Sequence, residues 1–252
     1  MLDKLLKNQL IRFLLAAIFW IAVWQIAALS VGTELLLPRP LTALQALLEA
    51  VRDTSFWSIV LRSIVRVFFG FMAGVLIGMI FAVLTSCSRI CDVLLSPAIR
   101  MIRAVPVASF IILALIWLKS TILPAFIAAL IVLPTVWGNL CEGIRQTNTQ
   151  LLEVARIYRF GRAKTIRYVY VPSVAPYFQS ACLTSLGLAW KSGIAAEVLC
   201  QPRMAIGTQL YYSKIYLNTD SLFAWTVVVI VLSFLLEVLV RKLLKRIGGR
   251  NR

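Results

Sequence analysis

Residues 67–88 read VFFGFMAGVLIGMIFAVLTSCS and contain no charged side chain. As an α-helix this stretch would be about 33 Å long, which is enough to cross the hydrocarbon core of a bilayer. Small residues recur at every fourth position along one helical face: Gly70, Gly74, Gly78, Ala82 and Ser86. Such a face allows another helix to approach closely, and that helix could belong to the same chain or to a second subunit.

The rest of the chain has the same character. Hydrophobic residues make up 61% of the 252 residues, charged residues make up 14%, and the mean hydropathy is +0.89. A soluble domain could not present such a composition to water. Further spans are expected at Phe13–Leu29, at Ala104–Leu118 with a start reaching back toward Pro97, at Ser120–Cys141, at Tyr168–Trp190 continuing to Ala196, and at Ser221–Leu236. We therefore predict an all-α membrane protein of about six transmembrane helices, forming a single domain over residues 1–252.

Between the first two spans, residues 41–51 place Leu41, Leu44, Leu48 and Val51 on one helical face. The other face is polar. The segment is too short and too charged to cross a bilayer, so we expect an amphipathic helix in the membrane interface.

The distribution of charge predicts the orientation. The chain has 26 Lys and Arg against 10 Asp and Glu, and 18 of the 26 fall in segments on one side of the predicted membrane. These segments are the N-terminal tail, the loops at 89–103 and 145–167, and the C-terminal tail from Arg241. The positive-inside rule places this side in the cytoplasm, together with both termini. It also explains the basic composition without nucleic acid.

Several chemistries are excluded by what the sequence lacks. It contains no histidine, which excludes histidine-based catalysis and histidine-ligated metal sites. It contains no Gly-Lys dipeptide, so it has no Walker A loop for ATP. No carboxylates cluster at membrane depth. We therefore expect a protein that is not an enzyme and that holds no metal or cofactor of its own.

The fifth span carries two charges, Lys191 and Glu197, beside Trp190. Charged groups inside a membrane usually face the bundle interior or water, since exposure to lipid costs about 2.5–3.5 kcal/mol each. The two point about 120° apart on a helix and cannot form an i,i+4 pair. We name Lys191, Glu197 and Trp190 as candidate pathway residues, although Glu197 could instead reach the outer interface.

The loop 145–172 is hydrophilic but patterned. Asn148 or Thr149 can cap a short helix that ends before Gly161, and a second amphipathic piece, residues 162–171, leads to Pro172. Two short helices joined by a turn would stand out of the membrane. A basic loop of this kind could also simply bind anionic lipid.

This loop resembles the EAA motif of ATP-binding-cassette importer permeases, whose pattern is Glu-Ala-Ala, three residues, Gly, nine residues, Ile, one residue, Leu-Pro. Glu153, Ala155 and Pro172 match, and Val154, Val169 and Val171 are mild substitutions. Arg159 replaces the motif Gly, with Gly161 two residues later, so a shifted or reshaped turn is expected.

Four other stretches, in the same order along the chain, also look like permeases of the nitrate/sulfonate/taurine type. They are Leu37-Pro-Arg-Pro, Ser63–Phe71, Arg103-Ala-Val-Pro106 and Leu188–Glu197.

The resemblance implies a MetI-like type I importer permease core in a bacterial inner membrane. It implies coupling to a separate ATPase through Glu153, Val154, Ala155, Arg156, Arg159 and Gly161, with ATP and Mg²⁺ bound by that partner, expected in two copies. A second permease subunit, expected as a homodimer, and an extracytoplasmic solute-binding protein complete the assembly. The implied solute is a small anion such as nitrate, sulfonate or taurine, or a vitamin-like thiamine precursor. An ion-gradient-driven secondary transporter, with Lys191 and Glu197 coupling the ion, is the alternative.

Overall fold

The computed structural model describes residues 9–248, and every regular element among them is a helix. Four of the basic residues counted toward the orientation, Lys4, Lys7, Arg250 and Arg252, lie outside the described residues.

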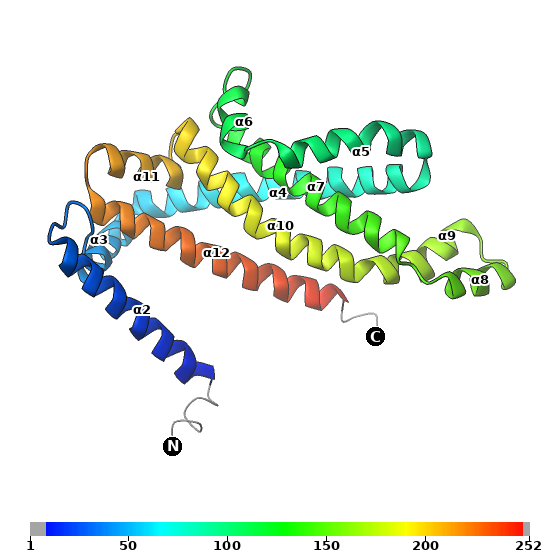
Figure 1. The fold of residues 1–252 in the computed structure, drawn as a ribbon, viewed down its shortest axis with the longest axis horizontal. Coiled ribbons are helices and arrows are strands. Elements are labelled where there is room, and N and C mark those ends of the chain that lie inside the picture. Colours follow the sequence, from blue (N-terminus) through cyan, green and yellow to red (C-terminus); the bar gives the residue numbers. More distant parts are fainter. Residues whose placement is uncertain (1–8, 249–252) are drawn as a thin grey trace.

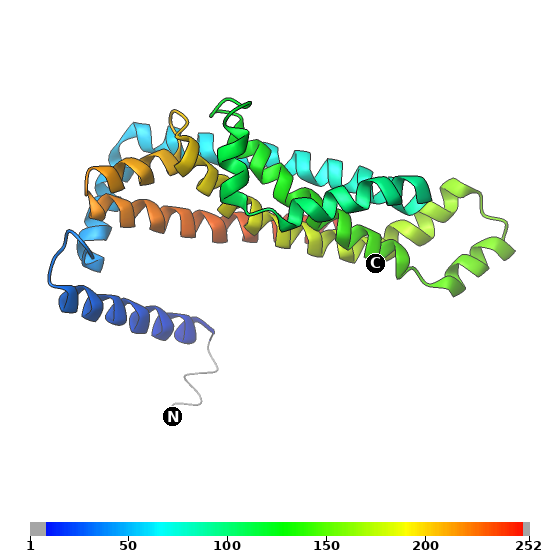
Figure 2. The ribbon, with the colours of Figure 1, turned by 45° about the horizontal axis from the view of Figure 1, so that its top comes forward.

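Four long helices lie side by side and form the body of the molecule (Figures 1 and 2). They are α4 (Thr54–Cys87), α7 (Leu123–Arg145), α10 (Val171–Cys200) and α12 (Thr219–Gly248). The main core cluster draws on all four, for example through Val67, Val132, Leu186 and Val228. The predicted spans at 67–88, 120–141, 168–196 and 221–236 are thereby confirmed as helices. Most are longer than expected because Arg62 and Glu197, among other charges, interrupt the apolar runs without interrupting the helices.

The small-residue faces pack within this one chain. A Cβ added at Gly74 would lie 2.6 Å from the carbonyl oxygen of Ala129, and one at Gly78 would lie 2.8 Å from that of Leu133. The backbones of α4 and α7 therefore meet at these glycines. On α10, a Cβ at Gly193 would lie 2.6 Å from a methyl group of Val67. The small residues of α4 and α10 therefore pack against other helices of the same chain.

The third expected span is not one continuous helix. Helix α5 (Arg89–Ala104) and helix α6 (Val107–Ala114) meet at an angle of 103°. Val105 is extended, with φ −76° and ψ 128°, because the ring of Pro106 disfavours a helical conformation for the residue before it. The expected third span is therefore broken at Pro106, and α6 turns away from the long helices (Figure 1).

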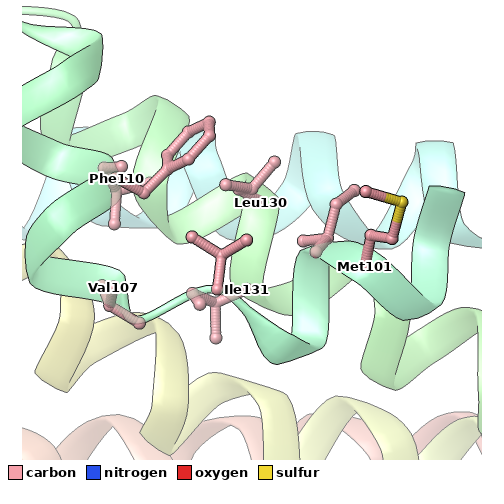
Figure 3. A pocket seen from close by; sticks show the side chains of 8 residues that line it. Met101, Val107, Phe110, Leu130 and Ile131 are labelled. Carbon is pink, nitrogen blue, oxygen red and sulfur yellow. The ribbon is translucent and has the colours of Figure 1, made fainter.

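The bend encloses an apolar cavity of about 120 Å³ between α5, α6 and α7. Figure 3 shows Met101, Val107, Phe110, Leu130 and Ile131 lining it. All eight residues that line the cavity are apolar, so it offers no polar side chain to bind an ion or a polar solute.

Helix α2 (Gln9–Val31) stands apart from the bundle and is joined to it through α3 (Pro40–Arg52) (Figures 1 and 2). The indole N–H of Trp24 donates to the carbonyl of Pro38 at 3.1 Å, and its ring stacks on Phe223. Helix α3 confirms the short amphipathic helix predicted at 41–51. Pro40 stands in its first turn, where the missing N–H costs nothing.

Within residues 9–248, α2, α4, α7 and α12 are long and apolar enough to cross a membrane, and the bent pair α5 and α6 raises the total to five. The fifth expected span, α10, has 30 residues and would be about 45 Å long. Polar and charged residues such as Lys191 and Glu197 interrupt its sequence, so it is not among the helices counted as apolar enough. Some of its small and polar residues, such as Ser185 and Ser192, are buried.

Candidate functional site

The motif-bearing loop contains a capped helix, α8 (Thr149–Ile157). The side chain of Asn148 accepts a hydrogen bond from the amide of Gln150 at 2.8 Å, which confirms the predicted cap. Helix α8 and the short α9 (Arg162–Thr165) project beyond the ends of α7 and α10 (Figures 1 and 2). The motif is therefore displayed at one end of the molecule.

The turn after α8 is centred on Arg159, at the motif's glycine position. Arg159 has φ 51°, in the left-handed region that glycine occupies without strain. The amide of Phe160 donates to the carbonyl of Ala155 at 2.8 Å, and the amide of Arg159 donates to that of Arg156 at 3.0 Å. These two bonds form a Schellman motif, which usually has glycine where Arg159 stands. The expectation of a shifted turn was wrong: the turn keeps its place, at a cost of roughly 1 kcal/mol for the Arg159 backbone.

Gly161 does not take over the glycine's role. It precedes α9 with φ −66°, which any residue can adopt, and a Cβ added there would meet nothing within 4 Å. The chain then passes through a π-helical turn, η1 (Ile166–Tyr170), into α10, with Pro172 in the first turn. Start and end of the loop thus agree with the prediction.

Burial divides the motif residues into two groups. Ala155 and Val169 are buried, and α8 contacts η1. Glu153, Val154 and Arg156 are exposed. Ala155 therefore faces the inside of the loop, while its exposed neighbours are accessible to a partner.

The three candidate pathway residues lie in different environments. Trp190 is buried, and its indole N–H donates to the carbonyl of Val229 on α12 at 3.0 Å. Lys191 is exposed on the same helix, on a face shared with Ser180, Thr184, Leu188 and Ala195. The structure therefore does not bring Trp190 and Lys191 to one site.

Glu197 is completely buried, and its carboxylate accepts three hydrogen bonds. Arg66 Nη1 lies 2.5 Å from Oε1 and forms an ion pair with it, while Ser63 Oγ donates to Oε2 at 2.8 Å. The amide of Gly207, in the first turn of α11 (Ile206–Ile215), donates to Oε2 at 3.1 Å. Ser63 Oγ in turn accepts from the amide of Ile206 at 2.9 Å. Glu197 thus ties α4, α10 and α11 together inside the protein and is not exposed on its surface.

The sequence reading missed Ser63, Arg66 and helix α11. One signal was present: Arg66 and Glu197 are opposite charges in two apolar helices, and such charges tend to pair. They are 131 positions apart, so spacing alone could not join them. A Cβ on Gly207 would overlap Glu197 and the backbone of Val198, which explains the glycine in this tight approach.

Among residues 9–248, no group of three or more Cys, Asp or Glu side chains is placed to hold a metal ion. The geometry instead combines long apolar helices, a buried ion pair and an exposed, capped loop at one end. These features describe a membrane helix bundle with an ordered, exposed loop at one end.

Comparison with known proteins gives the family. Residues 74–249 match the binding-protein-dependent transport system inner membrane component family, and the chain belongs to it. It is therefore a permease subunit of a binding-protein-dependent ABC importer, as the sequence resemblance implied.

The relatives agree with this assignment. The chain is 27% identical to the taurine transport system permease protein TauC of Escherichia coli, over 89% of this chain and 83% of TauC. It is 28% identical to the bicarbonate transport system permease protein CmpB of Synechococcus elongatus, over 75% and 71%.

Among solved structures, an amino acid ABC transporter with histidines superposes with a TM-score of 0.60 at 18% identity, covering 78% of this chain and 93% of that one. The MetNI methionine ABC transporter, in an inward-facing conformation, superposes with a TM-score of 0.55 at 16% identity, covering 77% and 93%. The MetI-like fold is thereby confirmed.

Proposed function

We propose that this permease imports a small anion, that it pairs with a second copy of itself, and that an ATPase drives it by gripping the loop 149–170. The carrying observation is that this loop is exposed, is ordered by its own caps, and presents the motif residues Glu153, Val154 and Arg156 outward. A handle of this kind can transmit force, because an ordered loop moves as a unit with the helices α7 and α10 that it joins.

The orientation follows from the charges. The loop, the α4–α5 turn and the C-terminal end of α12 lie toward one end of the molecule (Figure 1). Together with Arg145 at the start of the loop, these segments carry 11 of the 22 Lys and Arg in residues 9–248, and the positive-inside rule assigns that end to the cytoplasm of a bacterial cell. ATP is available only on this side. Helices α3 and α11 lie at the opposite end, where we expect the binding protein to deliver solute.

The proposed pathway runs along the exposed face of α10 that carries Lys191. An ammonium group facing lipid at membrane depth would be costly, so this face is better matched to water or to a second subunit. In a homodimer, the faces of the two α10 helices that carry Lys191 would line one shared translocation pathway. Trp190 and Glu197 lie on the buried side of α10, which favours a packing role for both over contact with solute.

The anionic substrate class rests on two observations. Lys191 supplies a positive charge to the proposed path, and the relatives are named for taurine, bicarbonate and nitrate transport. An electrostatically matched path would favour a small anion over a cation.

The test is ATP-dependent uptake in proteoliposomes containing the permease, its ATPase and its binding protein. Glu153→Arg should abolish uptake while leaving membrane insertion and thermal stability unchanged, since Glu153 is exposed. Glu49→Arg is the matched control for ATPase binding, which it should leave unchanged while Glu153→Arg weakens it, because Glu49 is also exposed but lies on α3 at the opposite end. Normal uptake by the Glu153 variant would refute the coupling role of the loop.

A further inference from the structure

The backbone of Arg159 is held in a conformation that its side chain does not favour. Four non-glycine residues have positive φ in the described part of the chain: Arg159, Gln201, Met204 and Leu217. The two backbone hydrogen bonds of the turn impose this conformation, but Arg159 is exposed at the tip of the projecting loop, so no buried side-chain contact explains why the residue is arginine and not glycine. Strain of this kind at an exposed position, where glycine would relieve it, indicates that the side chain itself has a use.

The surroundings of Arg159 indicate what it would bind. The segment 149–170 contains one acidic residue, Glu153, and five basic ones. The basic residues are exposed and are Arg156, Arg159, Arg162, Lys164 and Arg167. A guanidinium presents a planar set of donors that matches a carboxylate in two hydrogen bonds.

The apolar neighbours favour a protein over a lipid surface. Ile157 and Tyr158 are among the most exposed large side chains, and Phe160 next to Arg159 is also exposed. An interface that combines exposed aromatic and aliphatic residues with arginine is typical of protein recognition. Lipid head groups could be bound by any of the five basic side chains and would not require one in a strained backbone.

We propose that Arg159 pairs with a carboxylate in the cleft of the ATPase subunit, and that this pair helps the permease select its own ATPase. The inference rests on the proposed function, in which the ATPase grips this loop. The inference adds that the ATPase surface facing the tip of the loop must be acidic.

The strained backbone at Arg159 allows a variant that removes the side chain without destabilising the fold. Arg159→Gly relieves the backbone while removing the side chain, so the variant should fold at least as well as the parent protein. We expect its affinity for the ATPase to fall about tenfold, measured with the full-length permease in nanodiscs of neutral phosphatidylcholine. Arg159→Lys should recover only part of this loss. The affinity of the parent protein should also depend more steeply on salt than that of Arg159→Gly.

Leu217→Gly is the matched control. Leu217 occupies the corresponding position after α11, with φ 54°, and the amide of Asn218 closes the same type of turn on the carbonyl of Ser213. It lies at the opposite end of the molecule, so Leu217→Gly should leave ATPase affinity unchanged.

Three results would overturn the proposal. If Arg159→Gly binds the ATPase as tightly as the parent protein while Glu153→Arg binds it more weakly, the ATPase contacts the loop but Arg159 is not part of that contact. If neither variant is affected, the proposed function fails as well. If Arg159→Gly binds more weakly only in nanodiscs containing anionic phosphatidylglycerol, its contact is with lipid.

Discussion

Breaking the ion pair between Arg66 and Glu197 should destabilise the permease more than any other single charge change in the membrane. Glu197 has no exposed surface, and the side chain of Arg66 is 12% exposed, so neither charge can recover water when its partner is lost. Removing one member of such a pair costs about 3–5 kcal/mol. We therefore expect Arg66→Met to lose about 4 kcal/mol. Glu197→Gln should lose about 3 kcal/mol, since the amide oxygen can still accept from Ser63 or Gly207.

The double variant should lose much less than the sum of the two, because the second change leaves no additional charge unpaired. We expect a coupling energy of about 2–3 kcal/mol in the double-mutant cycle. The assay is thermal unfolding of the purified permease in detergent, where 1 kcal/mol corresponds to about 2–4 °C for a chain of this size. Arg62→Met, one turn away on the exposed face of α4, is the control and should change little. Additive losses, or single losses under about 0.5 kcal/mol, would refute the buried pair.

Three further outcomes follow from the packing and the path. Gly74→Val should cost about 2–3 kcal/mol in the same unfolding assay, since its side chain would meet the backbone of α7, and an unchanged stability would contradict the close α4–α7 approach. Gly207→Ala should release α11 from Glu197 and increase protease cleavage between α10 and α11, whereas parent-like resistance would show that α11 is held by other contacts. Lys191→Gln should lower anion uptake roughly tenfold without affecting ATPase binding, while Lys242→Gln, exposed on α12, should leave uptake unchanged; equal uptake by both would remove Lys191 from the path.

The sequence was most informative where a local physical rule operates alone. Uncharged runs such as 67–88 must be helical in a bilayer, because no water is present to satisfy the backbone. Asn148 and Pro172 mark helix starts by chemistry that lies within a few residues of each. The motif spacing from Glu153 to Pro172 located the loop correctly for the same reason.

It was less informative where distant segments decide the outcome. The turn at Arg159 remained in place because two backbone hydrogen bonds hold it against the preference of the residue. Pro106 accounts for a break at Val105, but the angle of 103° between α5 and α6 also depends on where α6 packs, which the sequence alone does not give. The Arg66–Glu197 pair and the docking of α11 depend on how α4 and α10 meet, which no local pattern records.

The most direct test of the central claim is photo-crosslinking from two tyrosines of equal exposure. Tyr158, on the loop, is 72% exposed, and Tyr216, at the opposite end, is 76% exposed. With p-benzoylphenylalanine in place of Tyr158, illumination of the intact transporter in membranes should produce a crosslink to the ATPase. The same residue in place of Tyr216 should produce none. A crosslink to the ATPase from position 216, or only lipid adducts from position 158, would contradict the account.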